Sequence, residues 1–72
     1  MNGYDVESMA RDVIIHYGLP FTFVSVNASS NGGWDISAQP GSGEVIRFRV
    51  ADGRPIAMRV AIHETLAQKQ RR

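Results

Sequence analysis

The chain has 72 residues, and its eight lysines and arginines against seven aspartates and glutamates give a formal net charge of +1. This length predicts a single small domain over residues 1–72, with a core near the lower limit that packing alone can stabilise. The absence of cysteine excludes disulfides, thiolate chemistry and cysteine-based zinc sites. The small net charge argues against a protein that holds nucleic acid by charge alone, since such proteins usually carry a strongly basic face.

No apolar run in the sequence approaches the roughly 20 residues that span a bilayer. The first residues show no basic region followed by an apolar stretch, so we expect no secretory signal. Together with the absence of cysteine, these features predict a cytoplasmic protein without a membrane partner.

The first segment has the pattern of an amphipathic helix. Its apolar side chains recur at intervals of three and four residues along one face: Val6, Met9, Ala10, Val13 and Tyr17. Asn2 or Asp5 can cap the N-terminus. Gly18 suits the position after the C-terminal cap, and Pro20 prevents the helix from resuming. We predict a helix from about Asp5 to Tyr17.

Alternating β-branched and aromatic residues predict three strands, over 21–28, 34–39 and 44–51. A three-residue loop ending with Gly32 in the left-handed conformation joins the first two. This loop places Val26 opposite Ile36, and Val24 opposite Ala38. The apolar residues of both strands then share one face, which is the constraint that fixes the register.

A five-residue loop at 39–43 joins the second and third strands in the same way. It places Trp34 opposite Phe48, and on the other face Asp35 opposite Arg47. A strand follows the glycines in both loops, whereas a phosphate-binding loop requires the N-terminus of a helix there. The glycines therefore indicate turns.

The last segment fits two patterns. Alternating apolar residues over 54–62 predict a fourth strand followed by a short C-terminal helix. Pro55 instead fits the first turn of a helix that continues to about Gln70. We favour the helix, because a fourth strand would leave a polar tail with Leu66 as its single large apolar anchor. Residues 70–72 are expected to form a frayed basic tail.

The expected fold is α+β, with the order helix, strand, strand, strand, helix. The strands form an antiparallel meander, and both helices cover one face of it. That face carries the apolar strand residues: Val24, Val26, Trp34, Ile36, Ile46, Phe48 and Val50. The other face is left open to water or to a partner.

The open face is the main candidate binding surface, formed by Phe23, Ser25, Asp35, Arg47 and Arg49. Phe23 would anchor a partner and the arginines would make polar contacts, which is typical of protein interfaces. We therefore predict a small non-enzymatic interaction module that binds a protein partner or a second copy of itself and needs no cofactor.

A nucleic-acid-binding module is the alternative. It would use the basic residues Arg47, Arg49, Arg54, Arg59, Lys69, Arg71 and Arg72. Phe23 would offer a platform for base stacking. The element order is similar in outline to double-stranded-RNA-binding domains, whose second helix begins with a lysine-rich segment. In this chain that segment offers only Arg54 and Arg59.

A small hydrolase or ribonuclease is the third alternative. The element order is also similar to small toxin-like ribonucleases, although the Gly-Ser-His strand of those enzymes is missing. His16 or His63 with Arg47 would have to supply the chemistry. Neither histidine has a second ligand three or four residues later, so no metal site is expected. No nucleophile elbow occurs in the sequence either.

Overall fold

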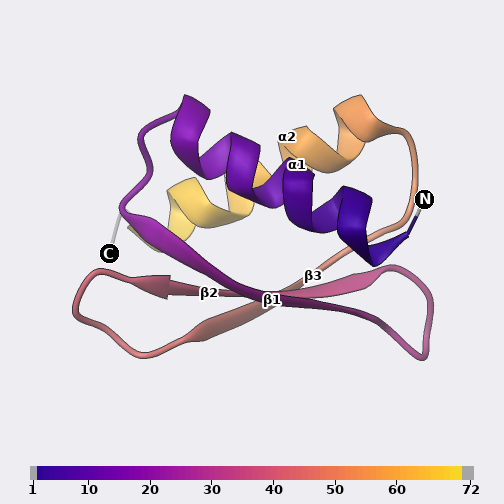
Figure 1. The fold of residues 1–72 in the computed structure, drawn as a ribbon, viewed down its shortest axis with the longest axis horizontal. Helices are drawn as coiled ribbons and strands as arrows, with labels where there is room; N and C mark the ends of the chain where they lie inside the picture. The colour runs from indigo at the N-terminus through magenta and orange to yellow at the C-terminus, as the bar shows by residue number, and fades with distance from the viewer. Residues whose placement is uncertain (1, 71–72) are drawn as a thin grey trace.

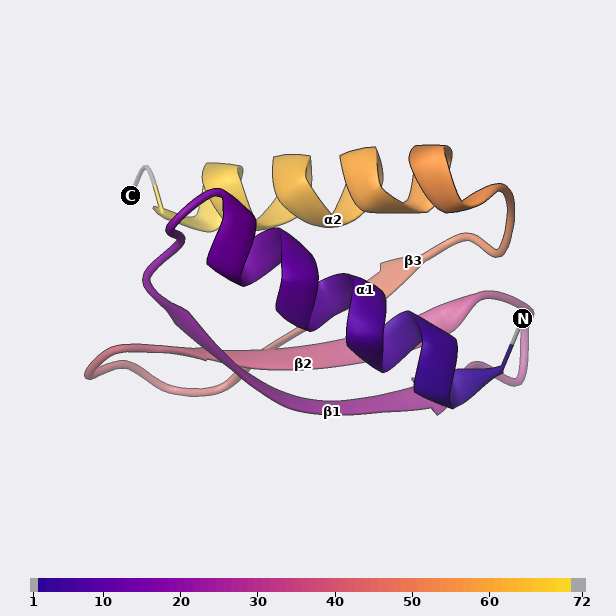
Figure 2. The same ribbon diagram turned by 45° about the horizontal axis from the view of Figure 1, so that its top comes forward.

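The computed structural model describes residues 2–70. Its elements are α1 (Gly3–His16), β1 (Phe21–Ala28), β2 (Trp34–Pro40), β3 (Ile46–Val50) and α2 (Pro55–Gln70). The strands form one antiparallel sheet in the order β1-β2-β3, and both helices lie on the same face of it (Figure 1). In the turned view α1 crosses over β1, and α2 lies beyond α1, next to β3 (Figure 2). The predicted α+β meander is confirmed.

The last segment is helical throughout, so the fourth strand over 54–62 is not formed. Gln70, expected at the start of a frayed tail, belongs to α2, and Arg71 and Arg72 lie outside the described residues. Within residues 2–70, neither helix combines the length and the apolar character that crossing a bilayer requires.

Local signals set both ends of α1. The Asn2 side chain accepts a hydrogen bond of 2.9 Å from the Asp5 amide, and the Asp5 side chain accepts one of 3.4 Å in return. This capping box starts the helix at Gly3, earlier than predicted. At the other end Gly18 takes a φ of 60°, and the Leu19 amide donates to the Ile14 carbonyl over 3.0 Å. A glycine in this conformation ends the helix, as the sequence predicts.

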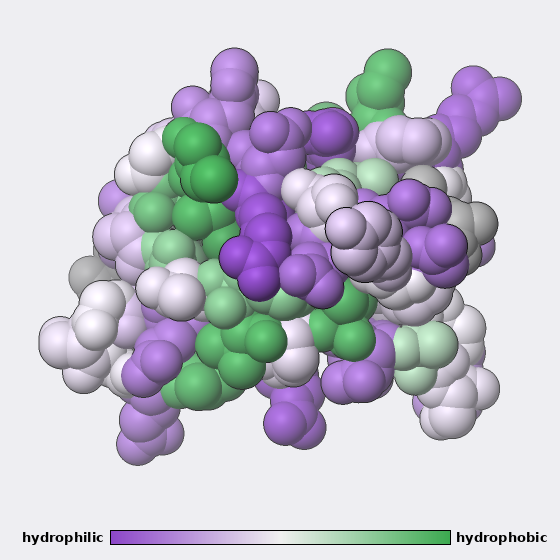
Figure 3. Space-filling model, in the orientation of Figure 1, coloured by the Kyte–Doolittle hydropathy of each residue, from purple (hydrophilic) through white to green (hydrophobic). Residues whose placement is uncertain are grey.

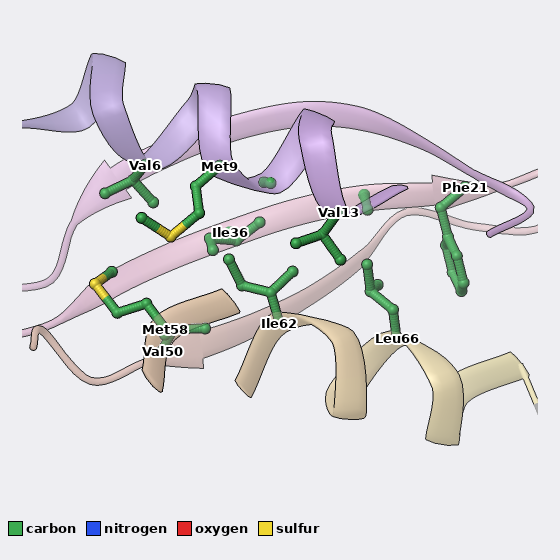
Figure 4. Packing of buried hydrophobic residues seen from close by; sticks show 11 residues of the cluster. Val6, Met9, Val13, Phe21, Ile36, Val50, Met58, Ile62 and Leu66 are labelled. Carbon is green, nitrogen blue, oxygen red and sulfur yellow. The ribbon is translucent and has the colours of Figure 1, made fainter. Parts of the chain in front are cut away.

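The core lies between the two helices and the sheet (Figure 4). Its buried residues are Val6, Met9, Ala10, Val13, Phe21, Ile36, Ala38, Val50, Met58, Ile62 and Leu66. Ile36 on the central strand faces Val13 of α1 and Ile62 of α2, so one side chain contacts both helices (Figure 4). Tyr17 was expected in the buried stripe of α1. It is 54% exposed, because the helix ends at His16.

The first hairpin has the predicted turn. The Ser29 amide donates to the Gly33 carbonyl over 3.0 Å, which leaves three residues in the loop. Gly32 takes a φ of 87°, and Gly33 also has a positive φ, of 79°. Val26 pairs with Ile36, as the sequence predicts.

A β-bulge changes the first half of β1. The register shifts between Phe23 and Ser25, so that Phe23, not Val24, lies opposite Ala38. One extra residue on one strand reverses the faces on either side of it. Phe23 therefore faces the helices, and Val24 is 45% exposed instead of covered.

The second hairpin differs from the prediction by two residues. Trp34 lies opposite Val50, not Phe48, and Asp35 lies opposite Arg49, not Arg47. The loop runs over residues 41–45, because β2 continues to Pro40 and β3 begins only at Ile46. A shift by two keeps every side chain on its predicted face, since side chains alternate along a strand. The apolar face is therefore correct although the pairing is not.

Candidate functional site

The open face of the sheet is more polar than predicted. Ser25, Asp35, Arg47 and Arg49 alternate with core residues along their strands and so point away from the helices. Ser37, between them on the central strand, is the buried polar residue of this face. Four of the five predicted surface residues thus share one face, and the fifth, the proposed aromatic anchor, does not.

The Phe23 side chain extends from β1, an edge strand of the sheet, toward α1. We call this side of the molecule the flank. Phe23 packs against the core, and the Arg11 guanidinium lies 4.9 Å above its ring. Apolar residues gather here in a band that passes from the C-terminal half of α1 onto β1 (Figure 3). Ile15, which is 78% exposed, is the most accessible of them. The hollow in this flank is only about 210 Å³.

Arg49 is occupied by the turn between β1 and β2. Its Nε donates to the Gly32 carbonyl over 2.9 Å, and its Nη2 donates to the Asn31 carbonyl over 2.9 Å. Turn carbonyls that point outward have no strand partner, so the guanidinium satisfies them in place of water. Arg49 therefore stabilises this turn. Fewer of its guanidinium N–H groups are then free to bind a ligand.

Arg49→Ala is expected to destabilise the protein by about 1–2 kcal/mol, because it removes charge-assisted hydrogen bonds to the turn. Arg47→Ala is the matched control. It is an arginine on the same strand and face, exposed and without a hydrogen bond among those described, so its loss should cost less than about 0.5 kcal/mol. Urea unfolding of both variants measures the difference. Equal losses would contradict the structural role of Arg49.

The basic residues of the nucleic-acid alternative lie apart. Arg47 and Arg49 are on the open face of the sheet, whereas Arg59 and Lys69 belong to α2 on the other side. Arg59 Nη1 forms a salt bridge of 2.6 Å with Asp12 Oδ2 of α1. Arg54 is exposed just before α2, and Arg71 and Arg72 lie outside the described residues. The described cations do not form one basic surface.

The largest concentration of functional side chains lies elsewhere, in a hollow of about 340 Å³ between the helices. We call it the interhelical groove. Eight residues line it, from the C-terminal half of α1, the cap residue that follows it, and α2: Asp12, Val13, His16, Tyr17, Ile56, Arg59, Val60 and His63. This volume is near the lower end for ligand pockets, which usually also enclose their ligand.

Three rings stack across one end of the groove. The His16 ring meets Tyr17 edge to face with centroids 4.8 Å apart, and the Tyr17 ring stacks on His63 at 4.1 Å. The histidines come from different helices, so Tyr17 joins α1 to α2 at this point. The Asp12–Arg59 salt bridge makes a second link between the helices. The aromatic stack and the salt bridge thus form one wall of the groove.

The helix α2 carries a second apolar stripe besides the one in the core. Met58, Ile62 and Leu66 are buried. A second row lies on another side of the helix, at intervals of four, three and four residues, and combines three apolar residues with a histidine, its last two members being half-buried: Ile56, Val60, His63 and Ala67. We call this row the outer stripe. Ile56 is 77% exposed and Val60 is 49% exposed, so the chain itself covers neither.

The catalytic alternative finds little support in this arrangement. His16 and His63 share the interhelical groove, but Arg47 points from the opposite side of the sheet. The groups that the sequence suggested for a ribonuclease are therefore not brought together. Among residues 2–70, no group of three or more histidine, aspartate or glutamate side chains is placed to hold a metal ion.

The interhelical groove was missed at the sequence level, although a signal for it exists. Val60 is apolar, yet in a helix it falls outside the face that Met58, Ile62 and Leu66 form, which indicates a second row of side chains. A scan against protein-family models and searches of curated proteins and of solved structures found no match to this chain.

Proposed function

We propose that this protein is a small non-enzymatic interaction module that binds a protein partner or a second copy of itself. The docking surface is the interhelical groove together with the outer stripe of α2. The open face of the sheet becomes the weaker candidate, because its expected anchor, Phe23, packs against the core.

One observation carries the proposal: besides its buried row, α2 has two large apolar side chains, Ile56 and Val60, that remain exposed on another side of the helix. A surface helix of a monomeric domain normally places its apolar residues on one side and polar residues on the other. Exposed Ile56 and Val60 adjoin Tyr17, which is also more than half exposed. Contiguous exposed apolar surface of this kind is typical of protein contact sites.

The composition of the groove also suits a protein interface better than a reaction site. Tyrosine and arginine are enriched in the residues that dominate binding energy at interfaces, and the groove has one of each beside its aliphatic side chains. A groove between helices that exposes aliphatic side chains is also the kind of surface that takes up a helix of a partner.

Ile56→Glu tests this surface. The substitution places a charge on the proposed contact surface, so it should weaken any association of the protein at least tenfold, a loss of about 1.4 kcal/mol or more. The fold should survive, because Ile56 is exposed and a glutamate in the first turn of a helix is favourable. Sedimentation velocity over a dilution series measures the association, and circular dichroism checks the fold.

Gln68→Glu is the matched control, since it adds the same charge at an exposed position of α2 outside the outer stripe. It should leave association unchanged. If wild type associates and Ile56→Glu associates equally well, the groove is not the docking surface. If wild type stays monomeric at every concentration, binding of a second copy is excluded and the proposal is restricted to a different protein partner.

A further inference from the structure

The outer stripe of α2 has the same spacing in both directions. Intervals of four, three and four residues separate Ile56, Val60, His63 and Ala67, and this is also the spacing of a seam between two packed helices. Because the intervals read the same in both directions, each residue of the row lies opposite a residue of the same row when a second copy of the helix runs antiparallel. We call such a row palindromic. In that register Ile56 lies opposite Ala67 of the other copy, and Val60 lies opposite His63.

The sizes of these residues favour the antiparallel arrangement. The large Ile56 meets the small Ala67, and the short Val60 meets the longer ring of His63. Pairing large with small residues lets helices pack evenly along their length. A parallel pair would instead set Ile56 against itself and Ala67 against itself, which forces the helices apart at one end and leaves a gap at the other.

The charges are compatible with a second copy. The groove beside the outer stripe holds one acidic residue, Asp12, and one basic residue, Arg59, already joined in a salt bridge. Such a surface neither repels its own copy nor matches a strongly charged partner. The net charge of the chain is only +1, so long-range repulsion between copies is also weak.

A stable dimer would have to bury a sizeable share of so small a protein. A standard interface buries about 800 Å² on each partner, which is about one-sixth of the accessible surface of 4841 Å². The outer stripe follows α2, which lies along the longest dimension of the molecule, 30 Å (Figure 2). A dimer contact of this size would therefore have to extend along α2 and include Tyr17 and the groove.

We infer that the protein forms a two-fold symmetric dimer in which the α2 helices pack antiparallel through their outer stripes, with Val60 of each copy opposite His63 of the other. This inference rests on the proposed function and names its partner as a second copy. A two-fold contact uses the same surface on both copies, which is what a palindromic row supplies.

The absence of cysteine makes the geometry directly testable. Val60→Cys and His63→Cys are prepared as separate proteins, mixed in equal amounts and oxidised. An antiparallel pair brings residue 60 of one copy next to residue 63 of the other, so the mixture should give a mixed disulfide dimer in larger yield than either protein alone. Gln68→Cys, on the polar side of α2, should cross-link with neither. Mass spectrometry distinguishes the mixed from the self-linked product.

Self-linked dimers in place of mixed ones would overturn the antiparallel geometry, and would leave the proposed function intact if Ile56→Glu still weakens association. Absence of cross-linking together with a monomeric wild type would overturn the dimer itself. Cross-linking of Gln68→Cys at equal yield would show random collision and would also overturn the inference.

A second measurement needs no cysteine. In the antiparallel dimer Ala67→Ile crowds Ile56 of the other copy and should weaken the dimer at least tenfold, whereas a parallel dimer would be tightened by the same change. Adding Ile56→Ala to Ala67→Ile restores the pairing of large with small residues and should recover the affinity of wild type. Sedimentation equilibrium of the three proteins decides between the two geometries.

Discussion

Ile62→Ala is expected to reduce the free energy of unfolding by about 2–5 kcal/mol, the usual range when a buried isoleucine is cut to alanine. Ile62 is fully buried, and its side chain points from α2 toward Val13 and Ile36 (Figure 4). The substitution therefore leaves a cavity where α1, α2 and the sheet meet. A domain of this length has a total stability of about 4–10 kcal/mol, so the variant should be partly unfolded in mild urea.

Ile56→Ala is the matched control, because it makes the same chemical change in the same helix. Ile56 is exposed, and alanine is the better helix former, so its stability should stay within about 0.5 kcal/mol of wild type. Urea melts are compared at one low protein concentration, since association would add to the apparent stability. If both substitutions cost the same, Ile62 is not the central core residue that the packing indicates.

Local signals explain why the elements were predictable from sequence. Gly18 ends α1 and Pro55 begins α2, and each acts through its own backbone conformation, which no distant contact has to supply. The apolar face of the sheet was likewise predictable, because side chains alternate along each strand whatever the exact pairing. This is why Ile36 and Val50 were placed in the core although the partner of Trp34 was wrong.

The pairing of β2 with β3 depends on features that are not local. Two registers that differ by two residues bury the same side chains, so hydrophobic alternation does not distinguish them. The choice depends on the loop over 41–45, where the Gly43 amide donates to the Pro40 carbonyl over 3.2 Å and an added Cβ at Gly43 would lie 2.9 Å from the Pro40 Cγ. These contacts form only after the loop has folded, so the alternation of the strand residues does not reveal them. The sequence therefore predicted the face of Asp35 but not its neighbour Arg49.

The bulge at Val24 could not be predicted from alternation either. Phe21, Phe23 and the later apolar residues of β1 all fit beneath the helices only if the strand gains one residue between them. That requirement comes from α1, which supplies Arg11 above the Phe23 ring. The candidate site depended on this point, because the proposed anchor changed faces when the bulge formed.

The interhelical groove, like the bulge, depends on contacts between segments that are distant in sequence. His16 and His63 are far apart in sequence, and only the packing of α1 on α2 places Tyr17 between them. The outer stripe of α2, by contrast, was present in the sequence. Its first two members, Ile56 and Val60, also fitted the alternative strand over 54–62, in which they share a face with Met58. Once the helix is established, the same residues divide into a buried row and an exposed row.

Gly33→Ala is expected to destabilise the protein by about 2–5 kcal/mol, through backbone strain and a steric clash together. Gly33 has a φ of 79°, a conformation that costs a residue with a Cβ about 1–2 kcal/mol. An added Cβ would also lie 2.7 Å from the Val50 carbonyl oxygen and 3.3 Å from the Ala51 Cα. Both are backbone atoms at the end of β3, so neither can move aside as a flexible side chain would.

Gly32→Ala separates the two contributions. Gly32 has a similar φ, of 87°, but an added Cβ there meets only the end of the Arg49 side chain, at 3.9 Å. It should therefore carry the strain without the clash and cost about 1–2 kcal/mol. Urea melts of both variants give the difference between their free energies of unfolding. This difference measures the cost of the clash between an added Cβ at residue 33 and the backbone of Val50 and Ala51. If the two variants are equally stable, the close approach of β3 to Gly33 is wrong, and the register of Trp34 with Val50 is wrong with it, because that pairing is what brings the two backbones together.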